Sequence, residues 1–118
     1  MDRDLSLFIE DILENISLIE SSTKITREKF DYDRLIIDAT IRRLEIIGEA
    51  TKNIPNSFRE KYPEVPWKKI AGFRDVIIHG YFSIDFDAVW SIIKDDLPIL
   101  KKQILKVKED LERKEKKK

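Results

Sequence analysis

The sequence has no cysteine, one histidine, three glycines and four prolines among its 118 residues. Without cysteine there can be no disulfide framework and no thiolate metal site, and one histidine leaves too few nitrogen ligands for a zinc site. Few glycines and prolines, with 39% charged and 42% hydrophobic residues, are typical of a helical protein rather than a turn-rich β fold. We therefore expect an all-α protein with no metal and no cofactor.

Long apolar runs are also missing. No stretch approaches the ~20 consecutive apolar residues that cross a bilayer, and Met1-Asp2-Arg3-Asp4 lacks the basic-then-apolar order of a signal peptide. A chain of this length suits one domain that buries about two-thirds of its unfolded surface. The sequence thus predicts a single cytoplasmic helical domain over residues 1–118, without membrane contact and with a charged tail from about residue 108.

The formal charge is zero, but the two signs are unevenly placed. Residues 101–118 carry nine lysines and arginines against four carboxylates, which leaves 14 cationic against 19 acidic side chains in the rest. A basic chain end attracts nucleic-acid phosphates, but it also complements the negative end of a helix dipole and keeps a terminus solvated. The solvated tail is the preferred interpretation, because short basic runs are common and unspecific.

Apolar residues recur every three or four positions along most of the chain, which predicts amphipathic helices. The expected long helices cover residues 5–21, 33–53 and 66–79, and a fourth begins with Ser83 or Asp85 as its cap and runs to 111, with Pro98 kinking it or starting a fifth. Short helical turns are expected at 26–32 and 55–62. Gly48 falls in mid-helix, where glycine costs up to ~1 kcal/mol against alanine, so another helix should cross closely there. The predicted fold is an antiparallel bundle of four to five helices.

The only histidine, His79, lies in the segment Gly72-Phe73-Arg74-Asp75-Val76-Ile77-Ile78-His79-Gly80-Tyr81-Phe82. Histidine titrates near neutral pH, so it can accept and return a proton without strong tuning by its surroundings. A lone histidine in an apolar sequence is also often a hydrogen-bonded residue of the core or of a helix end. Gly80 is a natural helix stop, which places His79 and Tyr81 at the end of a helix or just past it.

Arg74 and His79 are five residues apart, about 140° on an ideal helix, and so do not share a face. Asp75, four residues before His79, would share one and could orient the imidazole. Two copies about a two-fold axis would bring both histidines and both arginines into one cleft. Such a cleft holds what metal-free RNA cleavage needs, an imidazole for the ribose 2′-hydroxyl proton and guanidinium groups for the phosphate. Catalysis here therefore requires a homodimer.

The segment from Arg74 to Tyr81 matches the pattern R-x4-H-x-Y, and other segments extend the match. These segments are Arg43-Leu44-Glu45-Ile46-Ile47-Gly48-Glu49-Ala50, Pro66-Trp67, Tyr81-Phe82-Ser83-Ile84-Asp85, Val89-Trp90 and Asp96-Leu97-Pro98. Over about residues 5–107 the sequence resembles the HepT-like proteins of the HEPN superfamily.

This resemblance implies a helical homodimer that is the toxin of a bacterial or archaeal toxin–antitoxin pair, a metal-independent endoribonuclease that cuts RNA. By position, His79 would be the general base or acid, Arg74 the phosphate-stabilising group, and Asp75 a supporting residue where the family has Asn or Asp. Tyr81 matches the tyrosine that nucleotidyltransferase antitoxins of the MntA type modify with AMP. Phosphate attached there would occupy the arginine cleft and repel an RNA backbone.

Two other functions stay open at this point. The same dimer could be a non-catalytic nucleotide- or substrate-binding subunit of a small nucleotidyltransferase, which the acidic charge of residues 1–100 mildly supports because it weakens attraction to RNA. It could also be a purely structural helical dimer, in which changes at Arg74 and His79 affect neither binding nor growth.

Overall fold

A computed structural model describes residues 3–79 and 83–116, and most of them lie in helices. The elements in chain order are α1 (Arg3–Ser22), α2 (Arg27–Tyr32), α3 (Arg34–Lys52), α4 (Asn56–Arg59), α5 (Trp67–Ala71), α6 (Phe73–Ile77), β1 (Ile78–His79), β2 (Ser83–Ile84), α7 (Phe86–Ser91), the π-helix η1 (Ile92–Asp96) and α8 (Leu97–Lys116). The expected all-α fold is confirmed.

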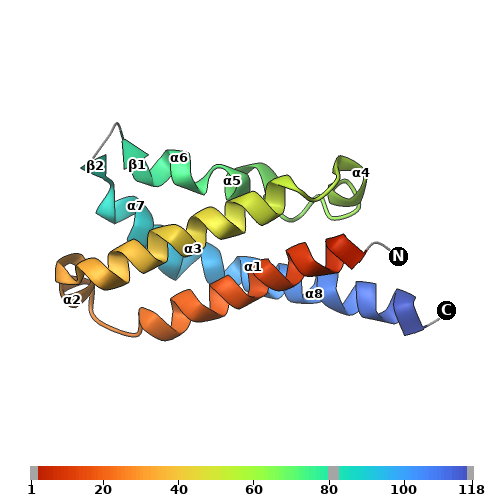
Figure 1. The fold of residues 1–118 in the computed structure, drawn as a ribbon, viewed down its shortest axis with the longest axis horizontal. Helices are drawn as coiled ribbons and strands as arrows, with labels where there is room; N and C mark the ends of the chain where they lie inside the picture. The colour runs from red at the N-terminus through yellow and green to blue at the C-terminus, as the bar shows by residue number, and fades with distance from the viewer. Residues whose placement is uncertain (1–2, 80–82, 117–118) are drawn as a thin grey trace.

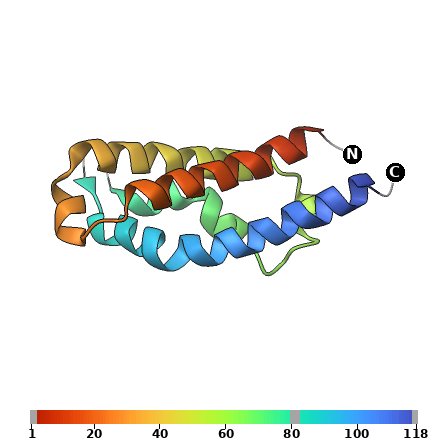
Figure 2. The ribbon, with the colours of Figure 1, turned by 90° about the horizontal axis from the view of Figure 1, so that it is seen from below.

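The helices form four runs that alternate in direction along the long axis of the bundle (Figure 1). α1 runs one way, α3 returns, α5 and α6 reverse again, and α7, η1 and α8 run back beside α1. α1 packs on both α3 and α8, as Figure 2 shows from below. The bundle measures 50 × 27 × 21 Å, and the two chain ends lie at the opposite end from β1 and β2.

Side-chain caps fix where three of the helices begin. Thr26 accepts a hydrogen bond from the Lys29 amide at 3.2 Å, and Asp33 accepts one from the Ile36 amide at 3.1 Å. Asp85 accepts one from the Ala88 amide at 2.9 Å, and this bond begins α7. These bonds satisfy amide groups that the first turn of a helix leaves without a partner.

The predicted helix over residues 66–79 is two short helices that meet at Gly72. The Gly72 backbone has φ −100° and ψ 12°, outside the helical range, and α6 ends at Ile77 because Ile78 is extended, with φ −114° and ψ 116°. His79 therefore lies in β1, past the helix, as the glycine signal indicated. The expectation that Asp75 and His79 share one helical face is wrong for this reason.

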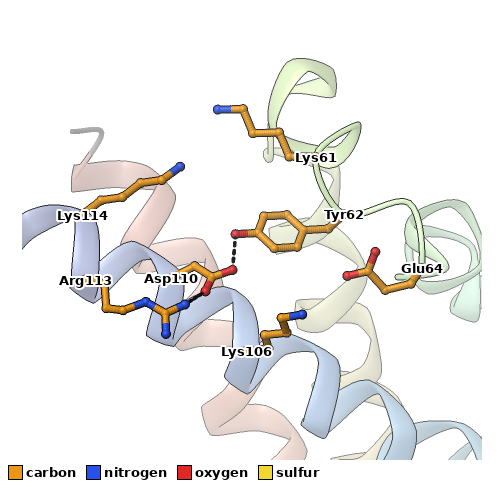
Figure 3. A pocket seen from close by; sticks show the side chains of 7 residues that line it. All are labelled: Lys61, Tyr62, Glu64, Lys106, Asp110, Arg113 and Lys114. Atoms are coloured by element: carbon orange, nitrogen blue, oxygen red, sulfur yellow. Dashed lines mark hydrogen bonds and ion pairs between the residues drawn. The ribbon is translucent and has the colours of Figure 1, made fainter.

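The connector between α4 and α5 is held in place by side chains at both ends. Trp67 Nε1 donates to the Tyr62 carbonyl at 3.0 Å. The Tyr62 hydroxyl donates to Asp110 Oδ2 of α8 at 2.8 Å, as Figure 3 shows. Gln103, also on α8, donates from Nε2 to the Glu64 carbonyl at 2.9 Å. The connector thus rests on α8 although it has no regular structure.

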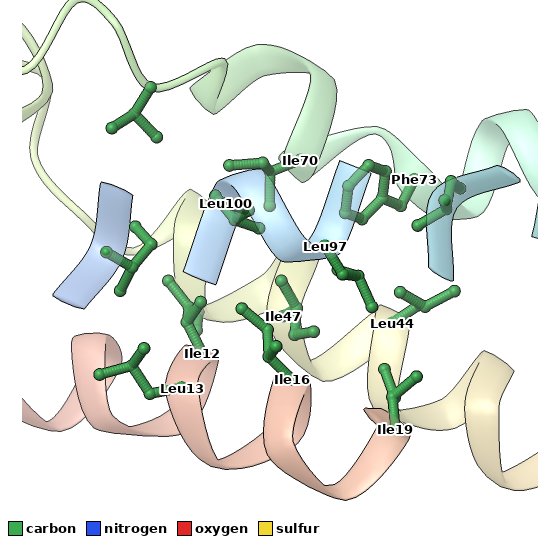
Figure 4. Close-up of a cluster of buried hydrophobic side chains, with 14 of the residues drawn as sticks. Ile12, Leu13, Ile16, Ile19, Leu44, Ile47, Ile70, Phe73, Leu97 and Leu100 are labelled. Atoms are coloured by element: carbon green, nitrogen blue, oxygen red, sulfur yellow. The ribbon is translucent and has the colours of Figure 1, made fainter. Parts of the chain in front are cut away.

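The core takes apolar side chains from all four runs (Figure 4). Its members include Ile12 and Ile16 of α1, Leu44 and Ile47 of α3, Ile70 and Phe73 of α5 and α6, and Leu97 and Leu100 of α8. Each such side chain contributes roughly 1.5–3 kcal/mol by leaving water. Leu111 is only 5% exposed, so α8 still packs on the bundle beyond residue 108. Within residues 3–79 and 83–116, no helix has the length and apolar character of a membrane span.

The helices α3 and α5 cross at Gly48, as the mid-helix glycine predicted. A Cβ atom at this position would lie 3.3 Å from the Ala71 carbonyl oxygen and 3.4 Å from that of Ile70. Because glycine has no Cβ, the backbones of the two helices can approach this closely. The crossing fixes α5 on α3, and α6 follows α5 directly.

Pro98 is the second residue of α8 and follows the π-helix η1. Proline has no amide hydrogen, and its ring crowds the carbonyl four residues earlier, so a regular α-helix cannot pass through it unchanged. The π-helix, with its wider hydrogen-bond spacing, joins α7 to α8 at this point. Ser91, Ile92 and Leu97 all have helical backbone angles, so α7, η1 and α8 form one continuous helical run in which the π-helix precedes Pro98.

A larger side chain at Gly48 should destabilise the protein. Val at this position would press on the α5 backbone, so Gly48→Val is expected to lower the free energy of unfolding by about 1–3 kcal/mol, the usual cost of overpacking. Chemical denaturation measures this. Glu49→Val is the control, because it adds the same side chain one residue later at an exposed position. Equal stability of the two variants would contradict the close crossing.

Candidate active site

The short helix α6 exposes Arg74 to solvent because two other residues of this helix are buried in the core. Phe73 and Ile77, four residues apart, are 2% and 0% exposed. Residues four apart share one face of a helix, so the residues between them point away from the core. Arg74, Asp75 and Val76 are accordingly exposed.

Arg74 has one described ionic neighbour, Glu45 of α3. Its Nε lies 3.9 Å from Glu45 Oε2, and its side chain is 64% exposed. An exposed ion pair at such a distance contributes little to stability, between about 0 and 1 kcal/mol. The guanidinium therefore stays available to a phosphate group, while Glu45 keeps it near α3.

A small pocket of about 110 Å³ lies between α3 and the α5–α6 run, beside Arg74. Its charged lining residues are Glu45, Glu49, Lys52, Arg74 and Asp75. Glu49 and Lys52 form an ion pair of 3.4 Å. Three carboxylates against two cations give the pocket of one chain an acidic balance, so a single copy offers a phosphate little net attraction.

The strand pair that follows α6 holds the backbone of His79. β1 and β2 are antiparallel, with Ile78 opposite Ile84 and His79 opposite Ser83. The Asp85 amide donates to the Ile77 carbonyl at 2.8 Å, which ties the end of β2 to the end of α6. His79 is thus fixed two residues past the helix that carries Arg74. The predicted modification position, Tyr81, lies outside the described residues.

The helix α7 anchors the other side of this strand pair. Phe30 of α2 packs on Trp90 with a ring-centroid distance of 5.2 Å, and Arg27 forms an ion pair with Asp87. The Lys94 ammonium lies 4.6 Å from the centroid of the Trp90 ring, a cation–π contact. The two strands are therefore attached to packed helices on both sides, α6 before them and α7 after them.

Glu45, the carboxylate beside Arg74, was not among the site residues predicted from the sequence. It precedes the crossing glycine, Gly48, by three residues, and residues three apart lie on the same side of a helix. Since α5 crosses at Gly48 and α6 follows, a carboxylate three residues before the glycine could have been expected to face α6. Among the residues that the structure describes, no group of three or more His, Asp or Glu side chains is placed to hold a metal ion.

A family model described as "Ribonuclease HepT-like" matches residues 12–107, a range that contains Arg74, His79 and Tyr81. The chain belongs to the HepT-like family. It is 46% identical over 109 residues to "Probable ribonuclease HepT" of Thermococcus cleftensis, and the aligned residues make up 92% of this chain and 99% of that relative. It is 47% identical over 103 residues to a "Putative RNase" of Methanocaldococcus jannaschii, covering 86% and 94% of the two chains.

A longer relative, also from Methanocaldococcus jannaschii, is named "Gamma-glutamylcyclotransferase and putative RNase". It is 46% identical over 114 residues, which are 96% of this chain but 51% of the relative, so the chain spans about half of that protein. No solved structure is significantly similar to the chain. The resemblance in the sequence to the HepT-like family is thus confirmed.

Removing the Arg74 side chain should leave the fold intact. Because this side chain is exposed and its one described ion pair is long, Arg74→Ala is expected to change the free energy of unfolding by less than about 1 kcal/mol. The matched change at the preceding residue, Phe73→Ala, empties a core position and should cost about 3–5 kcal/mol. Denaturant titration of both variants measures the difference. A large loss of stability in Arg74→Ala would indicate a structural role for the arginine.

Proposed function

We propose that this member of the HepT-like family is a metal-independent endoribonuclease that acts as a homodimer, with Arg74 and His79 in a composite site. One observation carries the proposal. Arg74 is exposed on a short helix that Phe73 and Ile77 anchor in the core, and this helix leads directly into the strand that holds His79. Membership of a family described as ribonucleases supports RNA as the substrate.

The reaction that these two residues suit is attack by the ribose 2′-hydroxyl on the neighbouring phosphorus. In the proposed reaction, His79 takes the hydroxyl proton and the oxygen forms a new bond to phosphorus. Arg74 stabilises the added negative charge on the phosphate oxygens by charge-assisted hydrogen bonds. The bond to the 5′-oxygen breaks and that oxygen receives a proton, which leaves a 2′,3′-cyclic phosphate and a 5′-hydroxyl. Asp75 is proposed to support this site.

Exposed apolar surface supports a homodimer, and a two-fold axis at this surface would bring the Arg74 guanidinium groups of both copies into one cleft. Val76, between the two catalytic residues in sequence, is 48% exposed. Tyr32 and Leu35, at the junction of α2 and α3, are 87% and 84% exposed. This junction lies at the same end of the bundle as β1 and β2 (Figure 1). An isologous interface at this end would cover these side chains.

The proposed biological role is that of the toxin in a toxin–antitoxin pair. Its partner would be a nucleotidyltransferase antitoxin of the MntA type, which transfers AMP from ATP to the Tyr81 hydroxyl and releases pyrophosphate. A phosphodiester two residues from His79 would bring negative charge next to the proposed phosphate site and exclude RNA. The resemblance of Tyr81 to the modified tyrosine of the family supports this role.

Cleavage of RNA in the presence of a chelator tests the activity. The wild-type dimer should produce 2′,3′-cyclic phosphate ends, and His79→Ala should reduce the rate by about 10²–10⁴-fold, the usual contribution of a general base. Arg74→Ala should lose cleavage as well, while Lys68→Ala, an exposed cation elsewhere on the surface, should not.

Mixing the two inactive variants tests whether the site is composite. After subunit exchange, a dimer of one Arg74→Ala chain and one His79→Ala chain keeps one arginine and one histidine, on different subunits. If the site uses these residues across the interface, the mixture should regain part of the cleavage. Cleavage by His79→Ala alone would contradict the proposed chemistry, and no recovery in exchanged dimers would contradict the composite site.

Mass spectrometry after incubation with the cognate nucleotidyltransferase and ATP tests the proposed modification. The wild-type chain should gain one or more adenylyl groups and lose cleavage, and Tyr81→Phe should gain none and stay active. Tyr62→Phe is the control, since Tyr62 is buried and hydrogen-bonded on α8. Adenylylation that persists in Tyr81→Phe, for example on the exposed Tyr32, would contradict the assignment.

A second candidate function, a non-catalytic nucleotide-binding subunit of the same nucleotidyltransferase, has the acidic balance of the Arg74 pocket in its favour. It predicts tight binding of that partner without any cleavage of RNA at any protein concentration. The cleavage experiment with the His79→Ala control therefore separates the two functions.

A further inference from the structure

A second hollow, of about 500 Å³, lies at the end of the bundle that holds the chain ends, between the α4–α5 connector and the last turns of α8. Figure 3 shows its seven lining residues. Four are cations, Lys61, Lys106, Arg113 and Lys114, which we name the basic cluster. The other three are Tyr62, Glu64 and Asp110. Cations outnumber carboxylates here, the reverse of the Arg74 pocket.

Helical spacing places three of the four cations together. Arg113 and Lys114 follow Lys106 by seven and eight residues, about two turns of α8, and all three line the hollow. Lys61 enters from the opposite wall, directly before Tyr62. In Figure 3 the side chains of Lys61 and Lys114 approach the opening from its two sides.

The wall that carries Lys61 is fixed rather than loose. Tyr62 is 9% exposed and its hydroxyl is bonded to Asp110. Burial and this hydrogen bond to a carboxylate raise the pKa of Tyr62 to about 12, so the hydroxyl keeps its proton and remains a donor at neutral pH. The ion pair of Arg113 with Asp110 further offsets the carboxylate charge. The backbone segments from which the surrounding cations extend are thus fixed before any ligand binds.

Three members of the basic cluster have no ionic partner among the side chains that the structure describes: Lys61, Lys106 and Lys114. Other lysines of α8 differ. Lys101 pairs with Glu20 and Lys108 with Glu10, both at 2.9 Å, because they face α1. The side of α8 that faces α1 therefore has its charge compensated within the bundle, whereas the side that faces the connector does not. Several uncompensated cations around one hollow suit a ligand with several negative charges.

We propose that the basic cluster binds the phosphate backbone of single-stranded RNA, as a second contact site at the end of the bundle opposite to the strands β1 and β2. This inference rests on the proposed function, because it takes RNA as the ligand. The acidic balance beside Arg74 gives a single chain little attraction for RNA at the active site, so affinity must come from another surface. Lysine and arginine contacts to phosphates carry no sequence information, so this contact strengthens binding without choosing the cleavage position.

Binding of a fully 2′-O-methylated single-stranded RNA tests this site, since such an RNA has no hydroxyl to attack and remains uncleaved. The test variant is Lys61→Glu with Lys114→Glu, and its matched control is Lys29→Glu with Lys68→Glu, two exposed lysines outside the hollow. Both variants change the net charge equally. Fluorescence anisotropy over a range of salt concentrations gives the Kd and its salt dependence.

The test variant should bind at least about tenfold more weakly at low salt, and its slope of log affinity against log salt should fall by about 1.4, for two lost phosphate contacts on a single strand. The control variant should lose less affinity and keep the wild-type slope. An equal loss in both variants, or an unchanged slope in the test variant, would overturn the proposal. So would unchanged RNA binding together with lost binding of the nucleotidyltransferase, which would make the hollow a protein-docking surface.

This test is independent of catalysis. If the RNA binds through the basic cluster but wild-type protein cleaves no RNA, the proposed function fails and the binding site stands. If the protein cleaves RNA and both charge-reversal variants bind alike, the binding site fails and the proposed function stands. Denaturation curves of both variants control for folding, which should be unaffected because the four substituted lysines are exposed.

Discussion

The close approach of α3 and α5 at Gly48 is the constraint on which the arrangement of the proposed site depends. Two carbonyl oxygens of α5 lie 3.3 and 3.4 Å from the place where a Cβ atom would stand, so the two helices approach each other through their backbones. Because α6 continues from α5 after one residue, this contact also decides how far Arg74 stands from α3, and hence from Glu45. The burial of Phe73 and Ile77 then decides which way Arg74 faces. A packing contact in the middle of the chain thus orients an exposed charge.

Much of the fold could be predicted from the sequence because its long helices have regular apolar periods and recognisable caps. The helix over Arg34–Lys52 follows its predicted range of 33–53 within one residue at each end, and Asp85, one of the two predicted caps of its helix, caps α7. The run from Pro66 was less predictable. Its apolar residues suit one continuous helix, but a break at Gly72 and extended backbone from Ile78 divide it. The spacing of apolar residues indicates which positions are buried. It does not indicate where the backbone between two buried positions stops being helical.

Only those features of the candidate site that depend on neighbouring residues in the sequence could be predicted. Arg74 and His79 are identified by their residue types and by their motif, and the structure adds the exposed position of Arg74 and the strand that holds His79. Glu45 comes from another helix, and its approach to Arg74 depends on the crossing at Gly48, which is a contact between distant segments. Tyr62 and Asp110, 48 residues apart, lie together for the same kind of reason. Tertiary packing, rather than any local pattern, brings such pairs into contact.

Both chain ends lie at the opposite end of the bundle from the strands that hold His79 (Figure 1). A second domain fused to either terminus would therefore extend the molecule along its long axis and leave the strand end uncovered. In the longer relative from Methanocaldococcus jannaschii, a region similar to this chain makes up about half of the protein. A fused neighbour would lie beside α4 and the last turns of α8, next to the proposed RNA contact site, and the proposed interface with a second copy would stay free.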